Sequence, residues 1–494
     1  MASFPKDLHF ILFPLMQQGH MILMIDIARI LAQYATVTII TTPVNTKRFK
    51  SVTDRAVESK LNIQVIELQL PLAEVGLPDG CENFDMLPSA NLFVKMYAAM
   101  DMLEKPAENV LRGLNPSPSC IISDNQFPWT NDVAKRLNIP RLVFHGPGCF
   151  TYLCLHIMMN TNVLNQIESD SDYFVVPGIS DRIELTKAQA GSWGKSETKE
   201  MVDFFTRMKV AEEAANGIVI NSFEELEVNY VGELAKAKDK KVWCIGPVSL
   251  HNRSIQDMAE RGNKAGIDEN DCLKWLDMKE QQSVMFVCLG SMSSFSHEQI
   301  IELGVGLELS NVPFIWCIRS STEETKRWLI GYEERVIDRG LIVHGWAPQV
   351  LILSHEAVGG FMTHCGWNST LEGVSAGLPM VTCPQFADQF LNEKFIIDVL
   401  QIGVSVGCKV VPNAFGEEDK FEVSAKKESV KMAVERIMDK EEEGEGRRMR
   451  AKKLGELAKS AMEKGGPSHL NTMSMIQDII EQLNENAKPI HDDV

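Results

Sequence analysis

Long apolar runs are missing from this chain of 494 residues. No stretch of about 18 apolar residues occurs, so we expect no membrane-spanning helix. The first apolar run, Leu8 to Met16, follows a single lysine and lacks a small-residue cleavage site. That run is therefore typical of a first strand and not of a signal peptide.

Positive charge is also in short supply, with 49 Lys and Arg against 67 Asp and Glu and a net charge of -18. A chain of this charge is a poor match for nucleic acid, because phosphate binding needs a basic face. The eleven cysteines include no CxxC pair. Their number is odd and their spacing irregular, so we expect reduced thiols and a cytoplasmic protein.

Short apolar runs alternate with amphipathic segments of helical length, which is typical of α/β proteins with parallel sheets. The expected strands are Leu8–Leu15, Thr36–Thr42, Ile63–Leu70, Cys120–Asp124, Arg141–His145, Gly217–Asn221, Ser283–Gly290, Pro313–Arg319, Gly340–Gly345, Val358–His364 and Pro379–Cys383. Helical patterns include Met21–Gln33, Trp129–Leu137 and Ser468–Asn484.

A turn signal at Gly246-Pro247 marks the expected domain boundary. We expect two facing, Rossmann-like, doubly wound domains with a ligand cleft at the carboxyl ends of their strands. The expected divisions are an N-terminal domain over 1–246, a linker over 247–270, a C-terminal domain over 271–470 and a final helix and tail over 471–494 that can pack back on the N-terminal domain.

The segment from Trp346 to Gln389 combines a strand, a glycine-containing turn and a helix start. Such a combination makes an anion site, because free N–H groups and the helix dipole point at it. His364, Asn368 and Ser369 add side-chain donors there. The last two could equally be helix caps, and the glycines could serve sheet packing.

Two further side chains of this segment suit a nucleotide. Glu372 follows one turn later and could accept hydrogen bonds from two ribose hydroxyls. Trp346 offers a flat face for a base. A nucleotide diphosphate fits the whole set.

These 44 residues resemble the plant secondary-product signature of the family 1 UDP-glycosyltransferases, which begins with Trp and here ends with Asp-Gln. The resemblance extends over nearly the whole chain and is close to the subgroup that acts on triterpenoids, steroids, flavonoids and cytokinins. It implies the GT-B architecture of two Rossmann-like domains. It also implies UDP-glucose as co-substrate, because Gln389 at the last position goes with glucose donors in the family.

The resemblance assigns a donor-binding role to thirteen residues. The uridine would be held by Trp346, the Ala347 backbone, Gln349 and Glu372. The diphosphate would be bound by His364, Asn368 and Ser369, and the sugar by Trp367, Asp388 and Gln389. The resemblance also assigns Gly19, Ser291 and Ser293 to the donor, but less directly. For Ser291 and Ser293 the reason is that their loop, GSMSSF, departs from the commoner family pattern.

Transfer to an alcohol needs a base, and a histidine suits this task because its pKa lies near neutrality. His20 follows the first strand, and Asp124 closes another strand of the same half. A carboxylate there could orient the imidazole, although 104 residues separate the two. The family carries its base in a similar Gly-His segment, with a strand-end Asp as partner. This chain has Leu23 where proline is common, which predicts an altered helix start.

The resemblance implies inversion at the sugar carbon without a metal cofactor. One DxD triplet, Asp170-Ser171-Asp172, lies in a polar stretch without a preceding strand, so a solvated loop is expected there. His355, His364 and Cys365 lack the spacing of zinc ligands.

Aromatic residues of the first half suit a flat or apolar acceptor, although each is more typical of a core or surface position. The candidates are Phe84, Phe127, Trp129, His145, Phe150, Trp193, Phe204 and, from the donor side, Phe386. Subgroup resemblance favours a triterpenoid or other terpenoid over flavonoids and cytokinins. We expect a monomer with no partner beyond its two substrates.

Two other function classes remain open from the residues alone. A nucleotide-cofactor oxidoreductase would also use doubly wound domains, but the first turn holds one glycine where GxGxxG is needed. A protein that binds a nucleotide sugar or aglycone without turnover is the second alternative. The presence of both His20 and Asp124 weighs against it.

Overall fold

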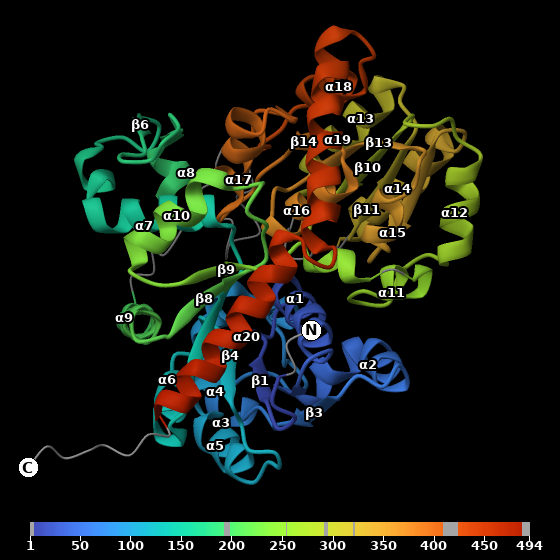
Figure 1. Cartoon of the computed structure of the whole chain (residues 1–494). Coiled ribbons are helices and arrows are strands. Elements are labelled where there is room, and N and C mark those ends of the chain that lie inside the picture. The colour runs from blue at the N-terminus through green and yellow to red at the C-terminus, as the bar shows by residue number, and fades with distance from the viewer. Residues whose placement is uncertain are drawn as a thin grey trace, which may run out of the picture. The chain divides into compact units, whose positions relative to one another are not determined.

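The computed structural model describes residues 4–191, 198–252, 254–290, 295–319, 322–408 and 423–486 (Figure 1). The chain splits into two compact units, neither of which is one continuous stretch. Unit 1 comprises Met1–Gly148, Ser196–Asn252 and Ala461–Val494, and unit 2 comprises Cys149–Lys195 and Arg253–Ser460. Within the described ranges, no helix is both long and apolar enough to cross a membrane.

Unit 1 is built on a seven-stranded parallel sheet in the order β3-β2-β1-β4-β5-β8-β9. Its strands are β1 (His9–Phe13), β2 (Thr36–Thr41), β3 (Ile63–Glu67), β4 (Cys120–Asp124), β5 (Arg141–His145), β8 (Gly217–Ile220) and β9 (Val242–Cys244). Its helices are α1 (Gln18–Leu31), α2 (Pro43–Glu58), α3 (Leu72–Val75), η1 (Phe84–Met86), η2 (Ala90–Leu92), α4 (Phe93–Asp101), α5 (Glu104–Arg112), α6 (Thr130–Leu137), α9 (Lys199–Glu213), α10 (Val228–Lys238), η4 (Val248–His251) and α20 (Pro467–Asn486).

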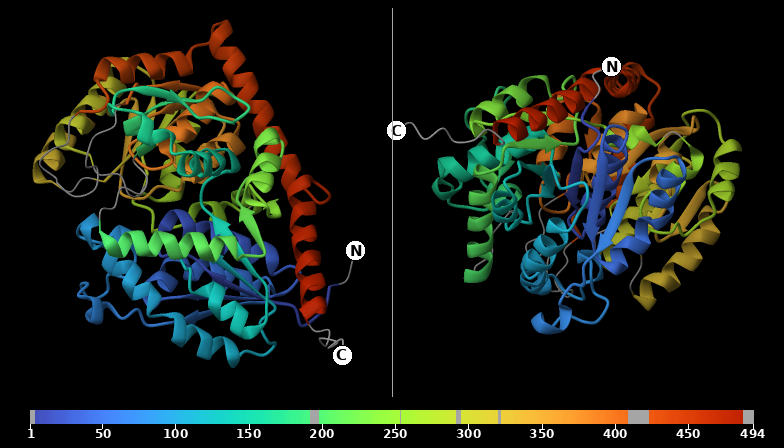
Figure 2. Two further views of the ribbon diagram at one scale, coloured as in Figure 1. Left: turned by 90° about the vertical axis from the view of Figure 1, so that its left-hand side faces the viewer. Right: turned by 60° about the horizontal axis from the view of Figure 1, so that its bottom comes forward.

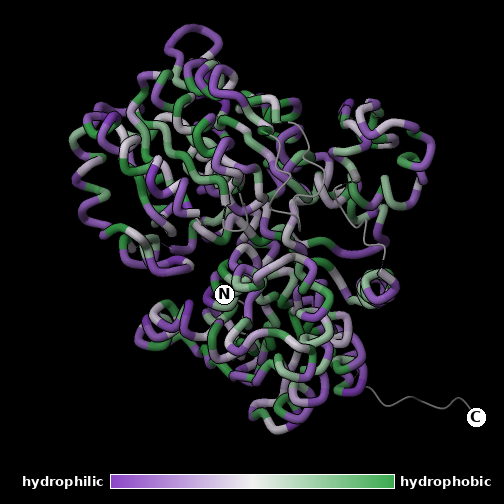
Figure 3. Tube along the Cα trace, turned by 180° about the vertical axis from the view of Figure 1, so that it is seen from behind, coloured by the Kyte–Doolittle hydropathy of each residue, from purple (hydrophilic) through white to green (hydrophobic). Residues whose placement is uncertain are grey.

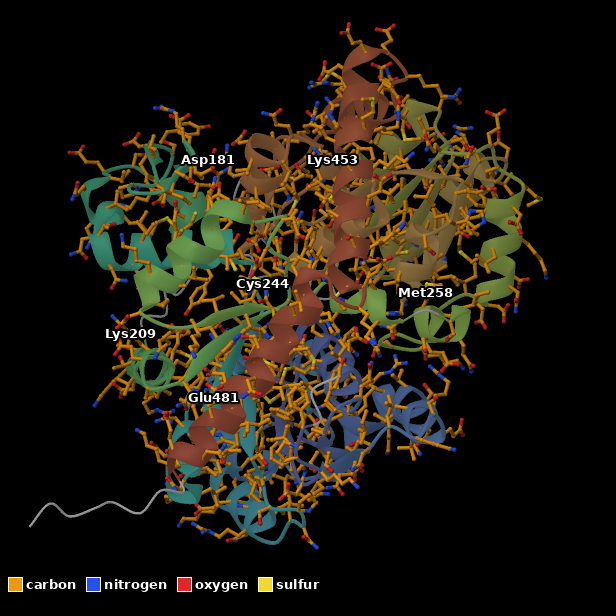
Figure 4. The ribbon with its side chains drawn as sticks, in the orientation of Figure 1. Asp181, Lys209, Cys244, Met258, Lys453 and Glu481 are labelled. Atoms are coloured by element: carbon orange, nitrogen blue, oxygen red, sulfur yellow. The ribbon has the colours of Figure 1, made fainter. Side chains whose placement is uncertain are left out.

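The last helix, α20, belongs to the core of unit 1. Its buried Met475, Ile476 and Ile479 join the same apolar cluster as the β1 and β2 side chains. Asn471 of α20 also donates to the carbonyl of Cys244, the residue labelled at the end of β9 in Figure 4. The end of the chain thus completes a layer that the N-terminal half begins.

Unit 2 is built on a six-stranded parallel sheet in the order β12-β11-β10-β13-β14-β15. Its strands are β10 (Val284–Cys288), β11 (Phe314–Ile318), β12 (Gly340–His344), β13 (Val358–Thr363), β14 (Met380–Thr382) and β15 (Gly403–Ser405), with a separate antiparallel pair, β6 (Tyr173–Val175) and β7 (Glu184–Thr186). Its helices are α7 (Cys149–Thr161), η3 (Val163–Gln166), α8 (Lys187–Gly191), α11 (Ile255–Ala259), α12 (Glu269–Asp277), α13 (His297–Ser310), α14 (Glu323–Val336), α15 (Gln349–Leu353), α16 (Trp367–Ala376), α17 (Gln389–Lys394), the π-helical η5 (Phe395–Val399) and α18 (Lys427–Met438). Helix α19 (Glu442–Met462) carries the chain from unit 2 into unit 1.

Each sheet reverses its strand order at one point, between β1 and β4 in unit 1 and between β10 and β13 in unit 2. Ligands of doubly wound sheets bind at the carboxyl ends of the strands beside such a point. Figure 2 shows helices beside each sheet, and Figure 3 shows apolar segments inside each unit with polar segments along its outer turns. Because ligands bind beside the reversal points, we expect the functional residues in the loops that follow β1, β4, β10 and β13.

The predicted α/β class is confirmed, and all eleven predicted strands correspond to strands of the two sheets. The three-residue strands β6, β7, β9 and β15 were not predicted, because three residues are too few to show a periodic pattern; β14 is equally short, but it lies within the longer apolar run Pro379–Cys383. One helix boundary was wrong. Helix α1 begins at Gln18 and not at Met21, so His20 lies inside its first turn, and Gln17 provides no side-chain cap.

Two helical glycines of unit 2 give a matched test of packing. A Cβ on Gly306 of α13 would lie 2.6 Å from Cβ of Val430 and 2.9 Å from the Lys427 carbonyl of α18. Gly331 of α14 has nothing within 4 Å of that position. Gly306→Ala should destabilise the protein by about 1–3 kcal/mol through overpacking, whereas Gly331→Ala should stabilise it by about 0.5–1 kcal/mol. Denaturant unfolding measures both, and equal effects would contradict this account.

Candidate active-site residues

The two residues proposed for acid–base chemistry meet in unit 1. Asp124 is the last residue of β4, and His20 lies in the first turn of α1, which follows the neighbouring strand β1. Nδ1 of His20 and Oδ2 of Asp124 are 2.5 Å apart. The parallel register of β1 and β4 therefore brings together two residues that are 104 positions apart.

The geometry fixes the role of each atom in this pair. A carboxylate accepts hydrogen bonds, so a proton on Nδ1 makes this contact, and in that tautomer Nε2 is the basic nitrogen of the ring. Asp124 is fully buried, and its Oδ1 accepts a second hydrogen bond from the backbone N–H of Gln126 at 3.1 Å. The carboxylate is thus held from two sides while the His20 side chain stays 19% exposed.

The imidazole of His20 rests against the end of β5 as well. Its ring meets Phe144 edge-on, with 6.5 Å between centroids. A Cβ on Gly146 would lie 2.7 Å from Cε1 and 3.1 Å from Nε2 of His20, so only glycine leaves the ring in this place. Sequence reasoning did not single out Gly146, because its role depends on a contact across the sheet.

In unit 2, His364 follows β13 and lies between two glycines. A Cβ on Gly290 or on Gly366 would approach its Nε2 to 2.6 or 2.4 Å respectively. Burial lowers the pKa of His364 to about 4, so the imidazole is neutral at pH 7. Its Nδ1 is buried and has no hydrogen-bond partner in the described part of the chain. A neutral imidazole with such a nitrogen can donate to an anion.

The turn after His364 leads into the start of α16 without a side-chain cap. Cys365 has a left-handed backbone (φ 63°), which is held by a hydrogen bond from its N–H to Thr363. Gly366 is the N-cap residue and offers no side chain to the first N–H groups of the helix. Left-handed non-glycine residues cluster at functional sites. An uncapped ten-residue helix suits a phosphate at its start.

The three predicted donor-binding residues in the first turn of α16 differ in how far they are exposed. The indole of Trp367 is 4% exposed and packs beside Phe395, so the residue contributes its backbone to the first turn. Ser369 is buried and accepts a hydrogen bond from Gln349. Asn368 is partly exposed on the same turn.

A third cluster joins the residues predicted for uridine. Nε2 of Gln349 donates to Oε2 of Glu372 at 2.7 Å, and the indole N–H of Trp346 donates to the Arg261 carbonyl at 3.3 Å. Ala347 is buried next to them. Arg261 forms an ion pair with Oε1 of Glu372. Arg261 was not predicted from the sequence, because it precedes the signature segment and no local pattern connects it to Glu372.

The sugar-binding prediction falls on a tightly bonded turn before α17. Oε1 of Gln389 accepts from the backbone N–H groups of Gln385 and Phe386 at 2.8 and 3.2 Å. Asn392, which is fully buried, donates to both Asp388 and the Cys365 carbonyl. It therefore ties this turn to the turn before α16. Asn392 was another residue that the sequence analysis missed.

The acceptor candidates do not form a single group. Phe84 and Phe204 gather around Tyr97, which stacks on Phe204 with 4.2 Å between centroids. Phe127 and Trp129 pack instead with Phe13 in the core.

Nε2 of His145 lies 3.0 Å from a carboxylate oxygen of Glu212, and this contact fits a structural role. The two remaining described candidates lie in unit 2. Phe150 stacks on Phe395 at 4.9 Å, and Phe386 is partly exposed.

Several predicted residues add nothing to these clusters. Ser291, Ser293 and Trp193 lie outside the described residues. Asp170 and Asp172 lie in an exposed turn, as expected for a solvated loop, where Ser169 donates to the Asp172 carboxylate. Among the residues that the structure describes, no group of three His, Cys, Asp or Glu could hold a metal ion.

Each half of the chain matches a model of a known protein family. Residues 6–250 match the family model described as "Glycosyltransferase, N-terminal domain", and residues 264–410 match "UDP-glucoronosyl and UDP-glucosyl transferase". UDP-glycosyltransferase 73E1 of Stevia rebaudiana is 56% identical, with 98% of each chain covered. UDP-glycosyltransferase 73C11 of Barbarea vulgaris is 48% identical with the same coverage.

Solved structures of plant UDP-glycosyltransferases are also similar to this chain. Glycyrrhiza uralensis UGT73P12, complexed with glycyrrhetinic acid 3-O-monoglucuronide, superposes with a TM-score of 0.89 at 34% identity, covering 97% of this chain and 96% of that chain. Arabidopsis thaliana UGT89C1, complexed with UDP-L-rhamnose, gives 0.74 at 28% identity, with 96% and 100% covered. These relatives share the GT-B fold. With such matches over nearly its whole length, this chain belongs to the plant UDP-glycosyltransferases.

Proposed function

We propose that this enzyme transfers glucose from UDP-glucose to a hydroxyl of a small apolar plant metabolite, with inversion at the sugar carbon. A triterpenoid or another terpenoid is the preferred acceptor. The observation that carries the catalytic part is the 2.5 Å contact between His20 and Asp124 at the strand-order reversal of unit 1. A base held in one orientation by a buried carboxylate is what glycosyl transfer to an alcohol needs.

In the proposed reaction, Nε2 of His20 takes the proton of the acceptor hydroxyl as its oxygen attacks C1 of glucose. The new C–O bond forms while the bond from C1 to the diphosphate oxygen breaks, and UDP leaves. Asp124 stabilises the imidazolium that results. Attack opposite the leaving group inverts the α-linked donor to a β-glucoside.

The leaving diphosphate is proposed to be bound without a metal cofactor. Its charge would be met by the uncapped start of α16 and by His364, whose neutral imidazole can donate one hydrogen bond. Gly290 and Gly366 leave room for the His364 imidazole beside the start of this helix.

Glucose is the proposed sugar because of Gln389. Its Oε1 is engaged by two backbone N–H groups, which leaves the amide N–H₂ group as the part that can donate to a sugar hydroxyl. The turn that presents it also contains left-handed Ala387 (φ 55°) and the bonded pair Asp388–Asn392. A fixed donor at this place selects the orientation of a hydroxyl.

The terpenoid acceptor is supported by two observations. Phe84, Tyr97 and Phe204 form an aromatic group in unit 1, which suits an apolar aglycone. The Glycyrrhiza uralensis relative was crystallised with a triterpenoid glucuronide. We further propose that the enzyme acts in the cytoplasm, since its eleven cysteines are free thiols, and that it acts as a monomer.

The first test removes the base. His20→Ala should lower kcat/KM about 10²- to 10⁴-fold, the usual contribution of a general base, while UDP affinity stays within about twofold. Initial rates with UDP-glucose and a panel of terpenoid and flavonoid alcohols, together with calorimetry of UDP, measure both.

The matched control is His344→Ala, because His344 is 58% exposed and pairs with Glu333 at the surface. It should retain full activity. Near-normal turnover in His20→Ala would refute the assignment of the base. Wild-type protein that binds UDP-glucose but glucosylates nothing in the panel would instead favour a binding protein without turnover.

The second test concerns the sugar. Gln389→His should lower the ratio of UDP-glucose to UDP-galactose use, because it replaces the amide donor and frees the backbone N–H groups of Gln385 and Phe386. Competition between the two donors, followed by mass spectrometry, gives this ratio. An unchanged ratio would show that donor selection lies elsewhere.

A further inference from the structure

We propose that Arg261 is a positioning residue for the nucleotide: it holds Glu372 in the orientation that accepts the ribose hydroxyls. This inference rests on the proposed use of a UDP-sugar. It adds a residue from outside the signature segment to the recognition of the donor. The argument depends on one ion pair and on how the backbone around it is fixed.

The ion pair is nearly shielded from water. Nη1 of Arg261 contacts Oε1 of Glu372, and both side chains are only 8% exposed. An isolated carboxylate at this depth would be costly, because burial removes its hydration. The guanidinium of Arg261 offsets that cost for Glu372. An ionised carboxylate is also a stronger acceptor for hydroxyl groups than a neutral one.

The two oxygens of Glu372 each have one identified partner. Oε1 meets Arg261, and Oε2 accepts from Gln349, which also donates to Ser369. A carboxylate offers about four lone-pair positions. Two fixed donors thus set the plane of the carboxylate and leave acceptor capacity on both oxygens. Two adjacent ribose hydroxyls match that capacity.

The segment that carries Arg261 is fastened directly to Trp346, which is proposed to stack on the base. The Trp346 indole donates to the Arg261 carbonyl, and the Gly266 N–H donates to the Trp346 carbonyl at 2.7 Å. Ala265 and Trp346 form a parallel bridge. A Cβ on Gly266 would lie 2.0 Å from the His344 carbonyl, so the close approach requires glycine. The same segment therefore touches the residues proposed for the base and for the ribose.

Charge gives a further reason for a cation at this place. A ligand with a diphosphate brings negative charge into a unit that already holds the Glu372 carboxylate. Arg261 offsets the repulsion between the two. If the ion pair between Arg261 and Glu372 only stabilised the fold, its loss would affect the affinity for every ligand equally. Ligands with and without ribose hydroxyls therefore separate a positioning role from a structural one.

The experiment is a cycle between protein variants and ligands. Calorimetry measures the affinities of wild type, Arg261→Gln and Arg261→Lys for UDP and for 2′,3′-dideoxyuridine diphosphate. Wild type should prefer UDP by about tenfold or more, because hydrogen bonds to a charged group are lost with the hydroxyls. In Arg261→Gln the preference should fall to within about threefold. Arg261→Lys keeps the charge but not the planar fork, and should lie between them.

Arg335→Gln is the matched control, since Arg335 pairs with Glu308 on the surface of the same unit. It removes the same charge and should leave the preference unchanged. If Arg261→Gln or Arg261→Lys binds both ligands more weakly by the same factor, or binds both as wild type does, the positioning role is refuted. Should Arg261→Gln fail to fold, the Lys variant alone decides between these outcomes. Wild-type protein without UDP affinity would refute the proposed function itself.

Discussion

The parallel arrangement of strands is the constraint on which the rest of this protein depends. Parallel strands place all their carboxyl ends along one edge, and a reversal of strand order leaves room beside two of them. In unit 1 that place is occupied by His20 and Asp124, and in unit 2 by His364 and Gly290. Each pair joins segments that are far apart in the chain. Neither could form without the register of its sheet.

Burial then decides the chemical state of these groups. Asp124 is fully buried, and its two carboxylate oxygens are bonded to His20 and to a backbone N–H. His364 is half-buried, and desolvation of its imidazole lowers its pKa to about 4. One histidine is thus bonded to a carboxylate, and the other is kept neutral. The same residue type is suited to proton transfer in one unit and to hydrogen-bond donation in the other.

Much of the fold and part of the site could be predicted from the sequence. Eleven strands could be predicted from apolar runs, whereas β6, β7, β9 and β15, of three residues each, show no pattern of their own. The segment 346–389 holds most donor-side residues in one continuous motif, which is why they could be named in advance. Arg261, Asn392 and Gly146 could not, because each acts through a contact with a residue far along the chain or across the sheet.

The sequence by itself determined the fold class, because the class follows from local periodicity. It also determined the family and the residues suited to catalysis or donor binding, because most of these lie in one contiguous motif. Only the tertiary structure decided which of those residues meet. It joined His20 to Asp124, gave Phe84 and Phe204 a common aromatic neighbour in Tyr97, and assigned Phe127 and Trp129 to the core. The physical reason is that strand register and side-chain burial depend on packing over the whole sheet, which no local stretch of sequence encodes.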